Sequence, residues 1–138
     1  MEVRHERVDE QWVLLAENDV LLRSHLAQYL RDCGYKVAEA ISAYEAITIL
    51  NRNHPGIEAV ISNVEIAGDG FGLSQWLRHN RAGLPILLTG TAQRAADAAS
   101  QLCRRGSAAT ASESPDILLR RIQQALANRK AANASGRA

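Results

Sequence analysis

The sequence has few cysteines, few aromatic residues and no excess of charge. Its two cysteines among 138 residues, Cys33 and Cys103, lie outside any metal-ligand spacing. This pattern predicts reduced, mostly buried thiols and no disulfide framework. A formal net charge of +1 excludes the global field typical of nucleic-acid binders. Aromatic residues make up 4% of the chain, so a stacking platform for bases is not expected.

Long hydrophobic runs are also missing. None approaches the length that crosses a membrane, and the charged amino terminus has no apolar signal-peptide core. We therefore expect a cytoplasmic protein with no membrane contact. The length fits one domain, with a flexible arm over 1–11, a folded unit over 12–129 and a disordered tail over 130–138.

Short apolar runs alternate with amphipathic segments along this unit. The runs predict strands at 12–16, 35–40, 59–63 and 84–89, and a weak fifth strand of small residues at 106–111. Residues spaced by three and four predict a helix after each strand. Five strands alternating with five helices favour an α/β fold, an open parallel sheet with helices on both faces.

Several residues mark where the helices begin and end. Ser42 and Glu45 have the spacing of a capping box, and Ser114 precedes a proline at the start of the last helix. Asn18 is the expected cap of the first helix, and Gly34 is expected to end it in a left-handed conformation.

Polar residues follow the strands at one edge of the predicted sheet. Glu17 and Asn18 follow the first strand, Asn63 ends the third and Thr89 ends the fourth. The carboxyl edge of a parallel sheet is where α/β proteins place their chemistry. Asn63 is therefore the first candidate, although its amide neither ionises nor acts as a nucleophile.

From about Trp12 to Asn128 the chain resembles the receiver domain of two-component response regulators. The segments that carry the resemblance are Val13–Arg23, Gly34–Ala40, Tyr44–Ile47, His54-Pro55, Asn63 with Gly68–Phe71, Leu84–Gly90, and Gly106. The resemblance implies a flavodoxin-like, doubly wound, five-stranded parallel sheet of order 2-1-3-4-5. It also implies a site at the carboxyl ends of strands 1, 3 and 5.

The resemblance places the family's phosphorylation residues on this chain. The phosphoacceptor position is Asn63, and the acidic pocket falls on Glu17 and Asn18. The switch hydroxyl falls on Thr89, which matches the family. The switch aromatic falls on Thr110 and the phosphate-pairing lysine on Glu113. Because four of these positions are changed in the disabling direction, we expect a pseudo-receiver that is not an enzyme.

The same changes bear on the metal ion and on other phosphoacceptors. The family's Mg²⁺ needs hard oxygen ligands, and Asn18 removes one carboxylate, so we expect no cofactor. Weak Mg²⁺ binding through Glu17, Asp19 and Glu65 is the alternative. Phosphorylation of Ser62 or Glu65 is a further alternative, disfavoured because Ser62 is expected to point to the opposite face from Asn63.

The predicted function is therefore protein interaction in phosphorelay signalling by a single-domain, receiver-like protein. The resemblance implies a histidine kinase, a phosphotransfer protein or another regulator as partner. A homodimer through the face of the last two helices is an alternative, and no nucleic acid is expected. Basic residues on those helices mark the candidate partner face: Arg104, Arg105, Arg120 and Arg121.

A second hypothesis belongs to a different class. A flavodoxin-like module could bind a small ligand in the same carboxyl-edge cleft. It would need a glycine-rich phosphate loop or a ring of aromatic residues around the cleft, and the sequence has neither.

Overall fold

The computed structural model describes residues 11–52, 56–66, 70–105 and 115–136. Strands and helices alternate along the first eight elements, as the sequence predicts, and the last two described elements are both helices. The elements are β1 (Trp12–Ala16), α2 (Val20–Asp32), β2 (Lys36–Ala40), α3 (Ala43–Asn51), β3 (Ile57–Asn63), α4 (Gly70–Asn80), β4 (Ile86–Thr89), α5 (Ala92–Arg105) and α6 (Pro115–Gly136).

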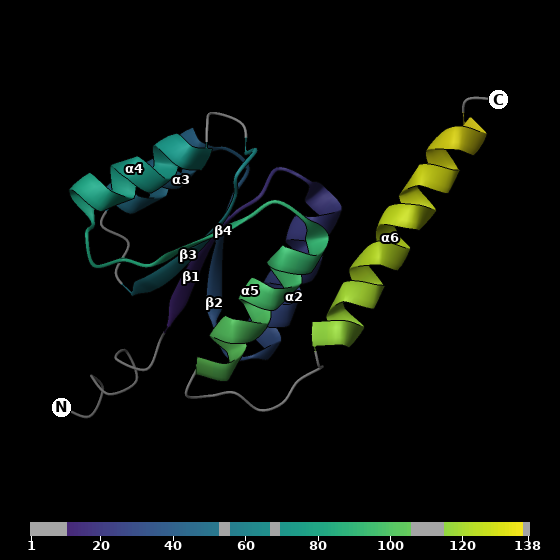
Figure 1. Cartoon of the computed structure of the whole chain (residues 1–138), viewed down its shortest axis with the longest axis horizontal. Helices are drawn as coiled ribbons and strands as arrows, with labels where there is room; N and C mark the ends of the chain where they lie inside the picture. Colours follow the sequence, from purple (N-terminus) through teal and green to yellow (C-terminus); the bar gives the residue numbers. More distant parts are fainter. Residues whose placement is uncertain (1–10, 53–55, 67–69, 106–114, 137–138) are drawn as a thin grey trace.

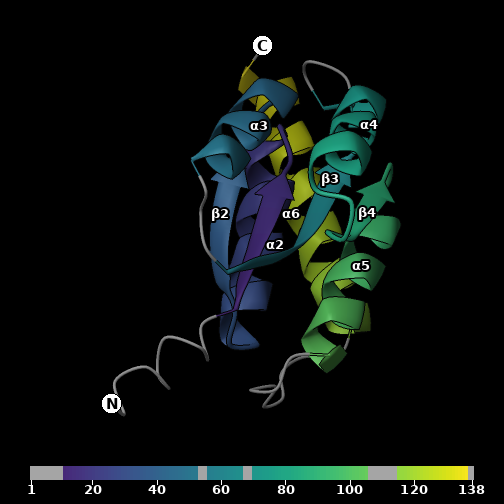
Figure 2. The ribbon, with the colours of Figure 1, turned by 90° about the vertical axis from the view of Figure 1, so that its left-hand side faces the viewer.

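The strands form one parallel sheet of order β2-β1-β3-β4. This confirms the first four positions of the predicted order 2-1-3-4-5, and Figure 2 shows the strand arrows side by side. The prediction of five strands is wrong for the sheet as described, which has four. The segment expected to supply the fifth strand, 106–111, lies outside the described residues.

Each central strand is buried on both faces, which explains its nearly continuous apolar sequence. Along β1, Val13 and Leu15 enter one apolar cluster, whereas Leu14 and Ala16 enter the other. Successive side chains of a strand point to opposite faces, so one short run supplies two cores.

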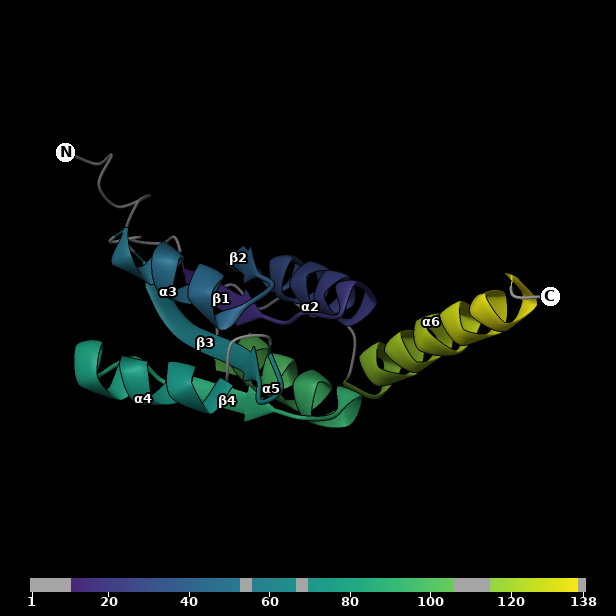
Figure 3. The same cartoon turned by 90° about the horizontal axis from the view of Figure 1, so that it is seen from above.

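The helices are divided between the two faces of the sheet, as Figure 1 and Figure 3 show. α3 and α4 cover one face, where Leu50, Leu73 and Leu77 are fully buried. α2 and α5 cover the other. α6 packs against α2 and α5 on their side away from the sheet, through Leu118 and Ile122.

The face on which α5 lies differs from the one that the predicted strand order implies. After β2 the strands are added on the other side of β1. The helices that connect them therefore lie on the opposite face of the sheet from α2, as right-handed crossovers require. A strand added outside β4 would need a covering helix on the α3 and α4 face. Because α5 lies on the α2 face, that strand would require a left-handed crossover, which is rare.

The two cysteines correct a prediction from the sequence. Cys33, directly after α2, and Cys103 in α5 form a disulfide across a separation of 70 residues. Their Cα atoms are 5.5 Å apart, within disulfide range. The prediction of reduced thiols was wrong because the spacing along the chain does not reveal that α2 and α5 share a face.

The ends of the helices confirm two predictions and correct a third. Gly34 has a φ of 100°, and Ser42 Oγ accepts a hydrogen bond from the backbone N–H of Glu45 at 3.0 Å. The tail predicted to be disordered from residue 130 instead continues α6 to Gly136. This extension is rich in alanine, the residue with the highest helix propensity.

Candidate functional site

Polar side chains gather where β1, β3 and β4 end. In the parallel register Ala16 lies opposite Ser62, and Asn63 lies opposite Thr89. Glu17, directly after β1, therefore lies near the end of β3. The structure thus brings together Glu17, Asn63 and Thr89, as predicted, at the carboxyl edge of the sheet.

The centre of this edge is a direct contact between Asn63 and Glu17. The Asn63 side-chain amide donates to both carboxylate oxygens of Glu17, at 3.1 Å and 3.3 Å. The Asn63 Oδ1 in turn accepts a hydrogen bond from the backbone N–H of Glu65 at 2.8 Å. This second bond fixes the orientation of the amide, so that its NH₂ group faces the carboxylate.

Glu17 is a buried acid, with 2% of its surface exposed. Burial raises its pKa above the ordinary value, because the charged form loses water. The hydrogen bonds from the Asp19 backbone N–H, at 2.9 Å, and from Asn63 act in the opposite direction. Asn63 is therefore an uncharged hydrogen-bond donor to a carboxylate that is buried away from water.

Asp19 has a different environment at the same edge. It is the N-cap of α2, and its Oδ1 accepts from the backbone N–H groups of Leu21 and Leu22 at 3.0 Å and 3.2 Å. This corrects the predicted cap, because Asn18 is exposed and the helix begins one residue later than expected.

Arg129, in the second half of α6, forms a bidentate ion pair with Asp19. Its guanidinium nitrogens lie 3.1 Å and 2.8 Å from the two carboxylate oxygens. The hydrogen bond from Arg129 lowers the pKa of Asp19. The sequence places Arg129 among the basic residues of the last two helices but does not reveal its pairing with Asp19, because a basic residue in a surface helix carries no signal of such a contact. The contact exists because α6 lies against α2.

The alternative phosphoacceptors occupy unequal positions. Ser62 is fully buried, and its hydroxyl donates to the backbone carbonyl of Asn63 at 3.2 Å. Glu65 is exposed beyond the end of β3. Thr89 is buried beside them, and its hydroxyl makes a long 3.5 Å contact with the Ser62 carbonyl.

Two of the predicted switch residues, Thr110 and Glu113, lie outside the described residues. The basic residues of the candidate partner face are divided between two helices. Arg104 is on α5 and donates to Ser100 at 2.9 Å, whereas Arg120 and Arg121 are on α6 and line a groove facing α2. Arg105 is the last residue of α5. The predicted face stays a prediction, with its residues on two helices that pack against each other.

The arrangement does not fit a magnesium site. Glu17 already accepts two hydrogen bonds from an amide, Asn18 brings no charge, and Asp19 is paired with an arginine. No group of three His, Cys, Asp or Glu side chains suited to a metal ion occurs in the part of the chain that the structure describes. None of its described helices has the length and apolar character needed to span a bilayer.

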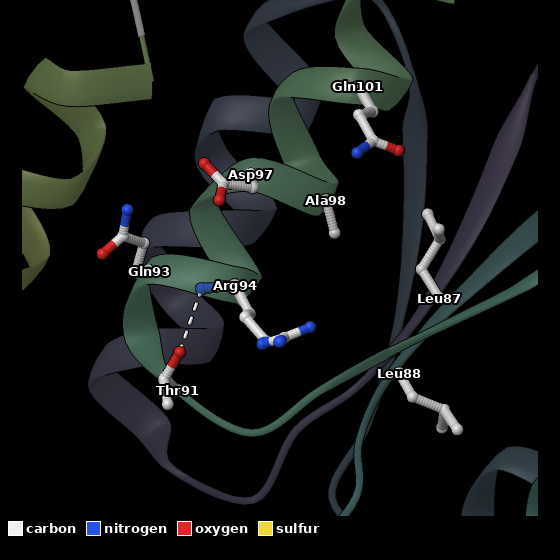
Figure 4. A pocket seen from close by; sticks show the side chains of 8 residues that line it. All are labelled: Leu87, Leu88, Thr91, Gln93, Arg94, Asp97, Ala98 and Gln101. Atoms are coloured by element: carbon white, nitrogen blue, oxygen red, sulfur yellow. Dashed lines mark hydrogen bonds between the residues drawn. The ribbon is translucent and has the colours of Figure 1, made fainter.

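A separate hollow of about 580 Å³ lies between β4 and α5. Figure 4 shows its walls, with Leu87 and Leu88 on the strand side and Arg94 and Asp97 on the helix side. Thr91 caps α5 there, its hydroxyl accepting from the Arg94 backbone N–H at 3.1 Å. Neither Asn63 nor Glu17 lines this hollow, so it is distinct from the carboxyl-edge site of the small-ligand hypothesis.

The parallel sheet with helices on both faces and polar residues at its carboxyl edge defines an open α/β domain of the doubly wound class. The family model for the response regulator receiver domain matches residues 13–110. The chain belongs to this family, whose place is in two-component signalling.

Individual proteins agree with this assignment. The chain is 38% identical over 76 residues to the transcriptional regulatory protein PhoP of Escherichia coli (strain K12), covering 55% of this chain and 34% of PhoP. It is 30% identical over 80 residues to the sensor histidine kinase RcsC of the same strain, covering 57% of this chain and 8% of RcsC. The chain therefore spans about a third or less of these relatives.

A solved structure gives the same fold. It is that of a candidate response regulator from Chloroflexus aurantiacus J-10-fl, with 26% sequence identity and a TM-score of 0.55. The match covers 86% of this chain and 98% of that one.

Proposed function

We propose that this receiver domain is a pseudo-receiver, which takes part in two-component signalling through protein contacts and is not phosphorylated at position 63. One observation carries the proposal: the Asn63 amide is hydrogen-bonded to both oxygens of the Glu17 carboxylate. An amide at this position offers no nucleophilic oxygen for phosphoryl transfer.

The surrounding charges support the same function. Phosphoryl transfer needs a cation to neutralise the charge that develops on the phosphoryl oxygens. The Arg129 guanidinium is bound to Asp19, and the Glu17 carboxylate is bound to Asn63. Both acids thus have hydrogen-bond partners within the chain. The partners consistent with this function are a histidine kinase, a phosphotransfer protein or another regulator.

Incubation with acetyl phosphate and Mg²⁺, followed by intact-mass analysis, tests this proposal. We expect no covalent adduct on the native chain, and no change in its thermal unfolding with beryllofluoride and Mg²⁺. A stoichiometric adduct that is stable in acid and labile in base would overturn it.

A matched set of variants then locates any adduct. Glu65→Gln and Ser62→Ala remove the two alternative acceptors one at a time, and loss of the adduct in one of them would identify that residue. Asn18→Asp serves as a control for the effect of added negative charge. It places an acidic residue at an exposed position and leaves Asn63 unchanged.

A further inference from the structure

We propose that the Cys33–Cys103 disulfide is a redox-controlled latch, which a dithiol reductant opens in the folded chain to release the end of α5 from α2. Cys33 directly follows α2 and Cys103 lies in α5, so the bond joins two helices of one layer. α6 packs against both of these helices. The inference is independent of the pseudo-receiver proposal, because it concerns the attachment of α5 and not the chemistry of position 63.

α5 has few large side chains with which to hold itself against the sheet and α2. Its described residues in the apolar cluster are four alanines, one leucine and one cysteine: Ala95, Ala96, Ala98, Ala99, Leu102 and Cys103. An alanine buries little apolar surface, and a buried leucine contributes much more. The attachment of α5 is therefore concentrated at Leu102 and Cys103, close to the end of the helix.

The last turn of α5 meets the segment that follows α2. The Tyr35 hydroxyl donates to the Leu102 backbone carbonyl at 2.6 Å, and the Leu102 side chain is buried in the same cluster. The Cys33–Cys103 bond lies beside these contacts, with its two Cα atoms 5.5 Å apart. When the bond opens, this turn loses its covalent attachment and depends on noncovalent contacts such as these. We therefore expect it to separate from α2 more often.

The release of α5 also affects the start of α6. Leu118 and Ile122 of α6 are buried in the cluster to which α5 contributes. The second half of α6 is held separately by the ion pair between Arg129 and Asp19, which does not involve α5. Opening the bond should therefore loosen residues 115–122 more than the segment around Arg129.

The redox step is a two-electron thiol–disulfide exchange with a dithiol, such as dithiothreitol or the dithiol site of a thioredoxin-like protein. A thiolate of the dithiol attacks the Cys103 sulfur, the S–S bond breaks, and Cys33 leaves as a thiolate. The second thiol of the reductant then cleaves the mixed disulfide, so the reductant is oxidised to its own disulfide. Cys33 and Cys103 are reduced to two thiols, and the two protons come from the dithiol.

The position of Cys103 allows this exchange without unfolding of the sheet. Cys103 has 7% of its surface exposed, against 1% for Cys33, and it lies in the last turn of α5. Helix ends open locally at a lower free energy than global unfolding requires. The contacts of Tyr35 and Leu102 keep the two thiols close to each other, so the bond can form again when the chain is oxidised.

A reducible bond at this place bears on the predicted partner face. The sequence predicts a cytoplasmic protein, and the disulfides of such proteins are mostly transient or redox-sensing. Arg104 and Arg105, two residues of the predicted face, directly follow Cys103. The redox state of the bond therefore sets whether this part of the face is held against the domain.

The test compares the oxidised and the reduced full chain by hydrogen–deuterium exchange. Dithiothreitol reduces the native chain, and iodoacetamide labelling counts the free thiols in each sample. We expect the amides of residues 99–105 to exchange about tenfold faster or more after reduction. Residues 115–122 should also exchange faster. Residues 70–80 of α4, on the opposite face of the sheet, are the internal control and should not change.

Two variants separate the bond from the contacts around it. Cys33→Ser combined with Cys103→Ser should exchange like the reduced native chain and should not respond to dithiothreitol. Tyr35→Phe keeps the bond and removes the hydroxyl that donates to Leu102. Its oxidised form should stay protected over 99–105, whereas its reduced form should re-form the bond more slowly than the native chain. Circular dichroism spectra establish that each variant is folded.

Four results would overturn the proposal: a bond that dithiothreitol reduces only in denaturant, equal exchange in both redox states, faster exchange of the whole chain after reduction, or re-oxidation to disulfide-linked dimers. The first would make the bond purely structural, and the third would make it a requirement for folding. A phosphoryl adduct would overturn the pseudo-receiver proposal and would leave all of these readouts unchanged.

Discussion

The two faces of the sheet are held in different ways. On the α3 and α4 face, large aliphatic side chains such as Leu50 and Leu77 fill the core. On the other face, the core residues of α5 are mostly alanines, among them Ala95, Ala96 and Ala99. An alanine buries little apolar surface, so α5 gains much less from burial than a leucine-rich helix.

On the second face, specific bonds hold the helices in addition to the packing. The Cys33–Cys103 disulfide joins α2 to α5, and the Tyr35 hydroxyl donates to the Leu102 carbonyl at 2.6 Å. The Asp19–Arg129 ion pair then joins α6 to α2. On this face α2 contributes large buried side chains such as Leu26 and Leu30, so it is α5 in particular that depends on individual bonds more than on its own apolar side chains.

The largest effect is expected from removing the disulfide. Cys33→Ala combined with Cys103→Ala releases a closed loop of 70 residues. The chain-entropy estimate gives a loss of about 4 kcal/mol in the free energy of unfolding. Urea unfolding under non-reducing conditions measures it. If alkylation of the denatured, unreduced protein modifies both cysteines, the link does not form and the comparison fails.

A cavity on the packed face is expected to have the next largest effect. Leu77→Ala removes a buried side chain, 1% exposed, and should cost about 3 kcal/mol in urea unfolding. Ala96→Gly on α5 is the counterpart on the linked face and should cost about 1 kcal/mol, because it changes helix propensity and little packing. Equal losses would contradict the difference between the faces.

Asn63→Asp tests the centre of the site. It replaces the amide donor with a second carboxylate beside Glu17, and we expect a loss of about 2 kcal/mol in unfolding free energy at pH 7. The loss should shrink as the pH falls and one of the two carboxyls takes up a proton. Urea unfolding at pH 7 and pH 5 measures this. If the variant is as stable as the native chain at pH 7, the Asn63–Glu17 hydrogen bonds make no net contribution to the free energy of unfolding.

The smallest effect is expected from the ion pair, and its sign depends on pH. Asp19 has a lowered pKa in the folded chain, so its contribution is present above the unfolded pKa of about 3.9 and is lost as the pH falls through the lower folded value. Arg129→Gln should therefore lower the thermal midpoint at pH 7, and the difference from the native chain should shrink as the pH falls below the unfolded pKa of Asp19. A difference that stays the same at acidic pH would assign Arg129 a role in packing.

Glu17 has the opposite pH dependence. Its pKa is raised in the folded chain, so the folded state holds this proton more tightly than the unfolded state. Its contribution is therefore most favourable below the unfolded pKa and falls as the pH rises through the folded value. Glu17→Gln should flatten that part of the stability curve.

Much of the fold could be predicted from local patterns. Apolar runs located all four strands, and the Ser42 cap and Gly34 located helix ends. The side of the sheet on which α5 lies could not be predicted, because an alanine-rich helix has no large apolar stripe to specify its face. The Cys33–Cys103 disulfide follows from that placement, because it joins α5 to the end of α2.

The candidate site shows the same division. Glu17, Asn63 and Thr89 could be predicted because each follows or ends a strand, and parallel strands bring such ends together. Arg129 could not, because its partner Asp19 is 110 residues away along the chain. The Cys33–Cys103 bond was missed for the same reason.

The sequence by itself thus determined the strands, the receiver family and the amide at position 63, because periodicity and residue type are local properties. Only the tertiary structure decided how that amide is used. It placed Asn63 Nδ2 beside the buried Glu17 carboxylate and brought Arg129 to Asp19. Contacts of this kind depend on which helix packs on which face, and that choice is made by the whole core.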